Sequence, residues 1–564
     1  MKETLIDIET YSEVDIGKCG LYRYATDPSF EILLVAWATD EGDGFGETRC
    51  ADLASGEPLP EELLEDFKSG NVRLIAHNAS FERVCFSVHL QRHLPGQYLK
   101  PGEFLSPDSW ICTMVMAASL TLPMALKDVG TVLKTSQQKD KEGERLIRMF
   151  SMPCKPTKSN GMRTRNLPEH YPADWEKFKY YCIQDVNTEV DIYKRLKKFP
   201  MPEQEWKHYR VNERINDRGV KIDTELVQQA IACDLMLSDA MSKKAYELTG
   251  LENPNSVSQL KSWLDERGIP MDTLGKKDVA QMIAELDKNG VDAEAMDMLK
   301  LRLQMAKSSV KKYQAAERCV CSDGRARGLF QFYGASRTGR YSGRNIQLQN
   351  LPQNHISTLD EARELVKLGC FDMVETIYGN TPDVLSQLIR TMLIPKEGCE
   401  FIVADFSAIE ARVLAWEAGE EWRLEAFLEG KDIYCASASQ MFHVPVVKHG
   451  INGELRQKGK VAELACGYGG SSGALISMGA LQMGLKEEEL PEIIDSWREA
   501  NPKIVQYWWD VEKAATQAFK TGKRQEIGKL AFEFYSGTLW MLLPSGRKLV
   551  LSLIHISEPT RLQL

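Results

Sequence analysis

The chain has 564 residues, 43% of them hydrophobic, and this length predicts two or three domains. Its net charge of −10 argues against binding nucleic acid over the whole surface, because phosphate contact needs lysine and arginine, but it allows a local basic groove. An apolar run of about 18 residues and a signal peptide are both absent, which excludes membrane and secreted classes, so we expect a cytoplasmic protein.

The first predicted strand, residues 4–10, carries two acidic residues. Since the side chains of a strand alternate between its faces, Asp7 and Glu9 project from the same face and can share divalent metal ions. Taken alone, such a pair is more often a solvated strand face. Further strands are predicted at residues 31–38 and 73–76.

Two predicted helices carry further acidic residues. Glu82 opens a helix directly after the strand at residues 73–76. A helical pattern over residues 178–185 places Tyr181 and Asp185 one turn apart on one face. The pattern therefore predicts a hydroxyl beside a carboxylate.

These residues together resemble the DEDDy exonucleases, which share an RNase H-like fold. In chain order the three motifs are Asp7-x-Glu9, Asn78-x-x-Phe81-Glu82 and Tyr181-x-x-x-Asp185. The second motif of the family normally ends in aspartate, whereas here it ends in glutamate. The resemblance implies phosphodiester hydrolysis with two Mg²⁺ ions, or Mn²⁺ in their place, and a catalytic Tyr181 that orients the attacking water. The implied metal ligands are Asp7, Glu9, Glu82 and Asp185.

The first domain is predicted to end near Pro200. Pro200 and Pro202 block continuation of a helix, and the basic cluster at residues 194–198 prefers solvent. Residues 218–223 precede a long amphipathic helix predicted from about residue 224, and residues 253–260 form a helix-capping start. Both stretches resemble the thumb region of bacterial DNA polymerase I.

Three lysines and a later segment are candidates for DNA contact. Lys307, Lys311 and Lys312 recur on a helical pattern and could grip a duplex backbone, although a solvated helix face shows the same pattern. Residues 338–342 and 347–352 resemble the segment of family A DNA polymerases that touches the primer terminus through the minor groove. This resemblance implies DNA contacts by Arg340, Gln349 and Asn350.

Residues 401–412 carry the strongest single motif. We predict an apolar strand that ends at Asp405 and a helix after it. The segment resembles motif A of the family A polymerases, which implies that Asp405 holds both catalytic Mg²⁺ ions and that the carbonyl of Phe406 is a further ligand. Glu410 would exclude a ribose 2′-hydroxyl. A buried strand that ends in a helix-capping aspartate is the alternative.

The following motif resembles motif B, the fingers helix of the same family. Four-residue steps predict that Arg456, Lys460, Leu464 and Tyr468 lie along one side of a helix. The resemblance implies that Arg456 and Lys460 bind the incoming triphosphate and that Tyr468 stacks near the templating position and supports Glu410. Leu464 belongs to the same nucleotide-binding face, where many family members carry an aromatic residue. An Arg-x-x-x-Lys pattern alone also arises by chance.

The third polymerase motif of the family, His-Asp-Glu, is expected after residues 543–549 and is absent. Residues 551–561 resemble a translated transposon-end sequencing adapter, so we interpret residues 551–564 as an artefact of assembly, with a divergent natural tail as the alternative. With Asp405 alone, the palm lacks the second carboxylate that fixes two metal ions. We therefore expect this polypeptide to polymerise poorly.

The motifs in this order resemble a family A DNA polymerase of the phage type with a proofreading 3′-to-5′ exonuclease in front. The resemblance predicts an α/β chain with an RNase H-like exonuclease domain at residues 1–199, then a right-hand polymerase with its thumb at 200–330 and palm and fingers at 331–550. It implies DNA synthesis by a monomer in the cytoplasm of a bacterial host, with primer-template DNA and dNTPs as partners. The alternatives are an exonuclease or DNA-binding protein whose polymerase half is structural, and a single-subunit RNA polymerase, against which Glu410 and the exonuclease motifs argue.

Overall fold

The computed structural model describes residues 1–135, 141–289, 292–305, 310–335, 337–481, 483, 485–535 and 537–551. The chain divides into an N-terminal unit, Met1–Ala118 with Pro123–Glu400, and a C-terminal unit, Ser119–Leu122 with Phe401–Leu564. Lys307 and residues 552–564, for which the sequence makes predictions, lie outside the described residues. The predicted boundary near Pro200 falls inside the N-terminal unit and stays a prediction.

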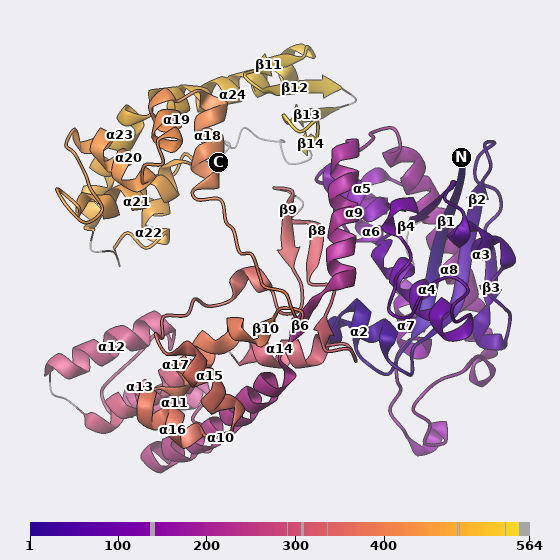
Figure 1. Cartoon of the computed structure of the whole chain (residues 1–564), viewed down its shortest axis with the longest axis horizontal. Coiled ribbons are helices and arrows are strands. Elements are labelled where there is room, and N and C mark those ends of the chain that lie inside the picture. Colours follow the sequence, from indigo (N-terminus) through magenta and orange to yellow (C-terminus); the bar gives the residue numbers. More distant parts are fainter. Residues whose placement is uncertain are drawn as a thin grey trace. The chain divides into compact units, whose positions relative to one another are not determined.

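A five-stranded sheet in the order β3-β2-β1-β4-β5 lies at the start of the N-terminal unit (Figure 1). Its strands are β1 (Lys2–Tyr11), β2 (Glu31–Asp40), β3 (Arg49–Asp52), β4 (Val72–Ala76) and β5 (Trp110–Cys112). β2 pairs antiparallel to β1 and β4 pairs parallel to it, so β1 is central and its Leu5, Ile6 and Ile8 are buried. The strands predicted at residues 4–10, 31–38 and 73–76 are confirmed as β1, β2 and β4.

Helices surround this sheet and carry the other two acidic motifs. They are α1 (Ile16–Cys19), α2 (Leu21–Thr26), α3 (Glu61–Lys68), α4 (Ser80–His93), α5 (Thr113–Ser119), α6 (Leu126–Leu133), α7 (Lys141–Phe150) and α8 (Pro172–Leu196). The predicted helix around Tyr181 and Asp185 is confirmed as part of α8, which packs against β1 and β2 (Figure 1). The predicted helix at Glu82 is α4.

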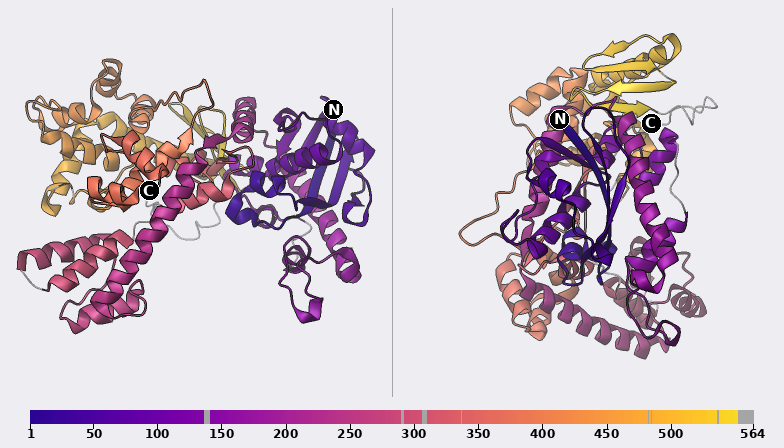
Figure 2. Two further views of the ribbon diagram at one scale, coloured as in Figure 1. Left: turned by 60° about the horizontal axis from the view of Figure 1, so that its bottom comes forward. Right: turned by 90° about the vertical axis from the view of Figure 1, so that its right-hand side faces the viewer.

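The rest of the N-terminal unit is mainly helical. Its helices are α9 (Glu203–Arg218), α10 (Thr224–Thr249), α11 (Val257–Glu266), α12 (Lys276–Asn289), α13 (Ala293–Met305), α14 (Lys311–Cys319), α15 (Leu359–Lys367), α16 (Phe371–Tyr378) and α17 (Thr381–Leu388). Its strands are β6 (Val220–Ile222), β7 (Arg325–Ala326), β8 (Phe330–Ala335), β9 (Arg340–Gly343) and β10 (Leu393–Ile394). Asp223 caps α10 and Ser256 caps α11, so the helix starts predicted at about residue 224 and within residues 253–260 are confirmed, and α10 runs unbroken for 26 residues (Figure 2).

The C-terminal unit has a helical part and an antiparallel sheet in the order β11-β12-β13-β14. Its helices are α18 (Ile409–Ala418), α19 (Glu421–Leu428), α20 (Ile433–Phe442), α21 (Leu455–Cys466), α22 (Ser472–Ser477), α23 (Leu490–Ala500) and α24 (Pro502–Thr521). Its strands are β11 (Gln525–Ile527), β12 (Leu530–Tyr535), β13 (Thr538–Leu542) and β14 (Lys548–Leu551). In the described part of either unit, no helix has the length and apolar character that a bilayer span needs.

The strand predicted before Asp405 is wrong. Residues 401–406 have no regular structure, and Ile402 and Val403 are 91% and 89% exposed. A strand is stable only where a neighbouring strand satisfies its backbone hydrogen bonds, and within the described ranges no strand pairs with this segment. The helix predicted after Asp405 is confirmed, since α18 begins at Ile409.

The helix predicted from motif B is confirmed only in part. α21 contains Arg456, Lys460 and Leu464 but ends at Cys466, so Tyr468 lies beyond it and the predicted row of four is wrong at its last member. The chain leaves the helical path in a glycine-rich stretch, where Gly469 has a φ of 71°, a left-handed conformation that favours glycine.

Candidate active sites

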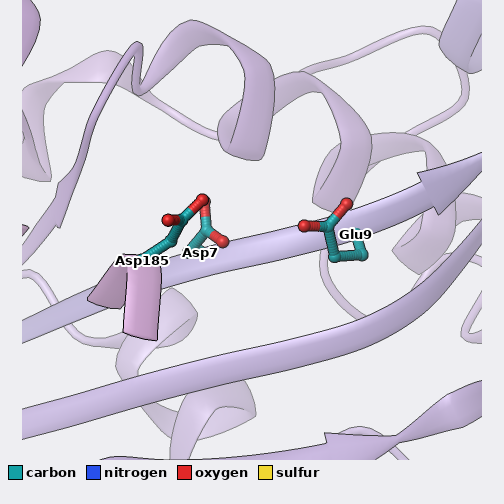
Figure 3. A group of neighbouring side chains, drawn as sticks. All are labelled: Asp7, Glu9 and Asp185. Atoms are coloured by element: carbon teal, nitrogen blue, oxygen red, sulfur yellow. The ribbon is translucent and has the colours of Figure 1, made fainter. Parts of the chain in front are cut away.

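Three carboxylates, those of Asp7, Glu9 and Asp185, come together in the N-terminal unit (Figure 3). One oxygen of each lies within 4.8 Å of the other two. Asp7 and Glu9 project from β1, and the carboxylate of Asp185 reaches toward that of Asp7 from α8. Glu9 and Asp185 are buried and Asp7 is partly buried. The structure thus unites residues of the first and third predicted motifs.

Local features of β1 and α8 explain this convergence. The register of β1 against β2 shifts between Glu9 and Thr10, and such an irregularity bends a strand and re-aims its side chains. On α8, Trp175 and Phe178 are buried, so the apolar face of the helix holds Asp185 against the sheet.

The donor set fits the predicted metal ions. Carboxylate oxygens are hard donors, which Mg²⁺ and Mn²⁺ prefer. Three carboxylates this close repel one another, most strongly where they are shielded from water, and a bound divalent cation relieves that repulsion.

Tyr181 lies one turn before Asp185 on α8, with its side chain buried. Burial, followed by the negative charges of Asp185 and Glu9, raises the pKa of its hydroxyl well above the usual value. The ring stacks on Phe178 and fills the space beside Gly143 on α7. The hydroxyl therefore keeps its proton at neutral pH and can orient a ligand by donating a hydrogen bond.

Glu82 is buried in the first turn of α4 and is not a member of the three-carboxylate cluster. Burial, followed by the charge of Asp7, raises the pKa of its carboxyl well above the usual value. Its Oε2 atom has no hydrogen-bond partner within the described residues. Glu82 therefore lies within electrostatic reach of the cluster, and its predicted role as a metal ligand stays a prediction.

The carboxyl of Glu189 is also buried beside the cluster, and the sequence motifs did not predict it. It lies on α8 one turn after Asp185, is 1% exposed, and accepts a hydrogen bond of 3.0 Å from Thr113 Oγ1. Burial, followed by the charge of Asp7, raises its pKa well above the usual value. The available signal was the four-residue step from Tyr181 to Asp185 to Glu189, which places all three on one helical face.

An apolar pocket of about 280 Å³ adjoins the cluster. Its lining includes Glu9 together with Phe81, Ile147 and Met152. The pocket is thus mainly apolar, and three acidic residues, Glu9, Glu13 and Asp15, also belong to its lining.

The described candidates for DNA contact in the N-terminal unit are Arg340, Gln349, Asn350, Lys311 and Lys312. Arg340 begins β9 and is exposed, as is Lys311 at the start of α14. Lys312 donates a hydrogen bond of 2.8 Å to the carbonyl of Ile346, and burial lowers the pKa of its amine. Lys312 therefore fixes the start of the turn that carries Gln349 and Asn350.

Two contacts in the C-terminal unit involve motif A and motif B residues. The hydroxyl of Tyr468 donates a hydrogen bond to the carboxylate of Glu410, so the contact that the sequence predicts between them is present. Arg456 donates from Nε and Nη2 to Asp432 Oδ2 at 3.0 and 2.9 Å, and its guanidinium lies 5.2 Å from the centre of the Tyr434 ring. Arg456 is thus held in a defined orientation.

The remaining polymerase candidates are more open to solvent. Leu464 on α21 is 37% exposed and Lys460 is partly buried. Asp405 and Phe406 are exposed in the irregular segment at residues 401–406.

Comparison with known proteins identifies the family. A model of DNA polymerase family A matches residues 229–527. Over 550 residues the chain is 53% identical to the DNA polymerase of Bacillus phage SP02, which corresponds to 97% of this chain and 82% of that protein. The chain belongs to DNA polymerase family A. The predicted resemblance to this family is confirmed.

More distant relatives agree with this assignment. DNA polymerase I of Geobacillus stearothermophilus is 27% identical to this polymerase over 303 residues, or 53% of this chain and 31% of that protein. The solved POL domain of Pol1 from M. smegmatis, in complex with DNA primer-template and dNTP, has a TM-score of 0.56 and 17% identity, and the match covers 99% of this polymerase and 79% of that chain. This likeness supports the predicted right-hand polymerase fold.

Proposed function

We propose that this polymerase combines template-directed DNA synthesis with a proofreading 3′-to-5′ exonuclease in its N-terminal unit. The convergence of Asp7, Glu9 and Asp185 is the observation that supports the exonuclease most directly. In this proposal residues 1–199 form the exonuclease domain.

The side chains around the cluster have distinct roles in the proposed hydrolysis. Two bound divalent ions would activate a water molecule and stabilise the leaving 3′-oxygen. Asp7, Glu9 and Asp185 would hold them, and Glu82 would contribute through water from its buried position. Tyr181 keeps its proton, so it orients the attacking water instead of removing a proton from it.

The apolar pocket beside Glu9 suits the last nucleoside of a DNA strand. Its volume of about 280 Å³ and its apolar walls can hold a base and sugar by burial and by contact with the ring of Phe81. The scissile phosphate of a strand seated there would lie toward the carboxylates.

Replacing Asp7 tests the exonuclease. Asp7→Asn is expected to abolish release of nucleotides from a 5′-labelled single-stranded oligonucleotide in Mg²⁺, and EDTA is expected to do the same to the unaltered chain. Asp66→Asn is the matched control, because Asp66 is also a buried carboxylate of this domain but lies outside the cluster. Full activity of Asp7→Asn would contradict the proposal.

The polymerase half is proposed to comprise the thumb at residues 200–330 and the palm and fingers at 331–550. Arg456 and Lys460 would bind the triphosphate, and Tyr468 would hold Glu410 in place against a 2′-hydroxyl. The other proposed contributors are Leu464 to the nucleotide, Asp405 and the Phe406 carbonyl to Mg²⁺, and Arg340, Gln349, Asn350, Lys311 and Lys312 to primer-template DNA.

Nucleotide binding separates this proposal from a purely structural polymerase half. Lys460→Ala is expected to weaken binding of a fluorescent dATP analogue about ten-fold, because it removes a charge-assisted contact to phosphate. Lys458→Ala is the control, since Lys458 lies on the same helix and pairs with Glu489 at 2.9 Å. If neither the unaltered chain nor the variants bound dATP, the polymerase half would be structural.

A further inference from the structure

A buried hydrogen-bond network lies beside the proposed exonuclease centre. Glu189 on α8 accepts from Thr113 Oγ1 at 3.0 Å and from the backbone N–H of His77. The Nδ1 atom of His77 lies 2.9 Å from Thr113 Oγ1, and its Nε2 atom lies 2.9 Å from the carbonyl of Met124. Glu189 and Thr113 are 1% and 0% exposed, so water does not compete for these bonds.

Two members of this network, Glu189 and His77, lie on or next to the elements that carry Asp185 and Glu82. Glu189 follows Asp185 by one turn on α8. His77 directly follows β4 and precedes Asn78, whose φ of 74° makes the turn into α4, the helix of Glu82. The hydrogen bonds therefore join the Asp185 helix to the turn that positions Glu82.

We infer that Glu189, Thr113 and His77 form a positioning network that sets where Glu82 stands relative to Asp7, Glu9 and Asp185. The inference rests on the proposed exonuclease function. Glu82 is one methylene longer than the aspartate of the motif that it resembles, and its Oε2 atom has no partner within the described residues that would fix it. A hydrogen bond from the backbone N–H of Glu82 itself ties the carboxyl to α4, so its position follows the placement of α4, which the network controls through His77.

A positioning role differs measurably from a role in stability alone. Groups that orient metal ligands affect metal affinity and activity by about 10- to 100-fold when they are removed, even where the ligands themselves remain. A residue needed only for folding lowers stability and leaves the metal dependence of the folded molecules unchanged.

The Thr113 hydroxyl offers the sharpest test, because Thr113→Val removes it at nearly constant volume and Thr113→Ser retains it. In the full chain, Thr113→Val and Glu189→Gln are expected to raise the half-saturating Mg²⁺ concentration for single-strand degradation about ten-fold. Thr113→Ser is expected to stay within about two-fold of the unaltered chain, since it keeps the hydrogen bond to Glu189. Asp66→Asn is the control for loss of a buried hydrogen-bonded carboxylate elsewhere in the domain.

Metal binding is measured separately from activity. Titration with Mn²⁺, with the free ion followed by electron paramagnetic resonance, is expected to show weaker binding in Thr113→Val than in Thr113→Ser at the sites that Asp7→Asn removes. Equal Mn²⁺ affinity and equal Mg²⁺ dependence in these two variants, or an equal change in Asp66→Asn, would overturn the positioning role. If Asp7→Asn removed no Mn²⁺ site and no nuclease activity, the proposed exonuclease centre itself would be wrong.

Discussion

Gly143 has no side chain at the point where α7 meets the ring of Tyr181. A Cβ at this position would lie 2.1 Å from ring carbon Cε2, well inside contact distance. The ring is the far end of a side chain, so it can move more easily than the helix backbone. Gly143 thus leaves the space in which the ring of Tyr181 points its hydroxyl toward the carboxylates.

Gly143→Ala is therefore expected to displace the Tyr181 hydroxyl. Because a displacement of a reacting or orienting group by about 1 Å lowers the rate by up to about 100-fold, we expect single-turnover hydrolysis of single-stranded DNA to slow by roughly 10- to 100-fold. The Mg²⁺ dependence is expected to stay unchanged, since the carboxylates are untouched. Gly70→Ala is the control, because a Cβ at Gly70 meets nothing within 4 Å. Equal rates in the two variants would show that the ring does not depend on Gly143.

His89 predicts a pH dependence of stability. Burial, followed by the charges of His93 and Arg92, lowers its pKa from 6.5 to about 4. Between these values the unfolded chain binds a proton that the folded chain does not, so stability from this group falls as the pH drops from 6.5 to 4. His89→Leu is expected to reduce that loss by up to roughly 3 kcal/mol, measured as the free energy of unfolding in urea at both pH values.

The control for His89 is His208→Leu, which removes an exposed imidazole. An equal loss of stability on acidification in His89→Leu and in the unaltered chain would contradict the assignment.

Among the elements, those that form from a local pattern were predictable and those that need a distant partner were not. β1, β2 and β4 follow from short apolar runs, and α8 follows from its four-residue period, so Asp7, Glu9, Tyr181 and Asp185 were located correctly. Residues 401–406 show an equally apolar run, but a strand also needs a pairing partner, which the sequence of one segment does not reveal.

The same limit applies to individual partners. Glu189 lies on a helical face that the sequence does predict, but its bond to Thr113 links residues 76 positions apart. The bond from Lys312 to the Ile346 carbonyl spans 34 positions and gives Lys312 a support role for the neighbouring turn, in addition to the DNA contact proposed for it. Such contacts depend on the packing of whole elements, which periodicity does not specify.

A buried ion pair holds the motif B helix α21 against a neighbouring helix. Arg423 on α19 is 0% exposed and donates to both carboxylate oxygens of Glu463, which directly precedes Leu464. Ser437 on α20 and Trp497 on α23 donate to the same carboxylate at 2.8 and 2.9 Å. Three helices, α19, α20 and α23, thus donate hydrogen bonds to one buried carboxylate of α21, the helix that carries the predicted nucleotide-binding residues.

Removing one partner of this pair is expected to be costly. Arg423→Met leaves the Glu463 charge buried without its counterion and is expected to lower the free energy of unfolding of the C-terminal unit by about 3–5 kcal/mol. Lys458→Met, which breaks the partly exposed pair between Lys458 of α21 and Glu489, is expected to cost much less than Arg423→Met. Urea unfolding of the full chain, followed by tryptophan fluorescence, measures both effects, and Trp497 in this core contributes to the signal.

The double variant Arg423→Met with Glu463→Met shows how much of the lost stability comes from the unpaired buried charge and how much from lost packing. It is expected to recover part of the lost stability, since apolar side chains of similar volume can replace a buried pair. A double variant less stable than Arg423→Met alone would show that the hydrogen bonds to Ser437 and Trp497 outweigh the cost of the unpaired charge.

At the scale of the whole molecule, the two proposed chemistries belong to different units. The cluster of Asp7, Glu9 and Asp185 lies in the N-terminal unit, and the motif A and motif B residues lie in the C-terminal unit. Each is built from residues of its own unit, so a substitution in one cluster is expected to leave the folding of the other unchanged. This separation allows the polymerase half to be tested in a chain whose exonuclease has been silenced.

The polypeptide of residues 1–564 is expected to extend primers at a rate near background. Its 564 residues contain Asp405 but no His-Asp pair, so a second carboxylate of the expected motif is not available beside it to fix two metal ions. In an Asp7→Asn background, which stops degradation of the primer, adding Asp405→Asn should therefore change the extension of a labelled primer very little. Vigorous extension that Asp405→Asn abolished would mean that another acidic side chain of these residues completes the polymerase centre, because one carboxylate alone cannot hold both ions in place.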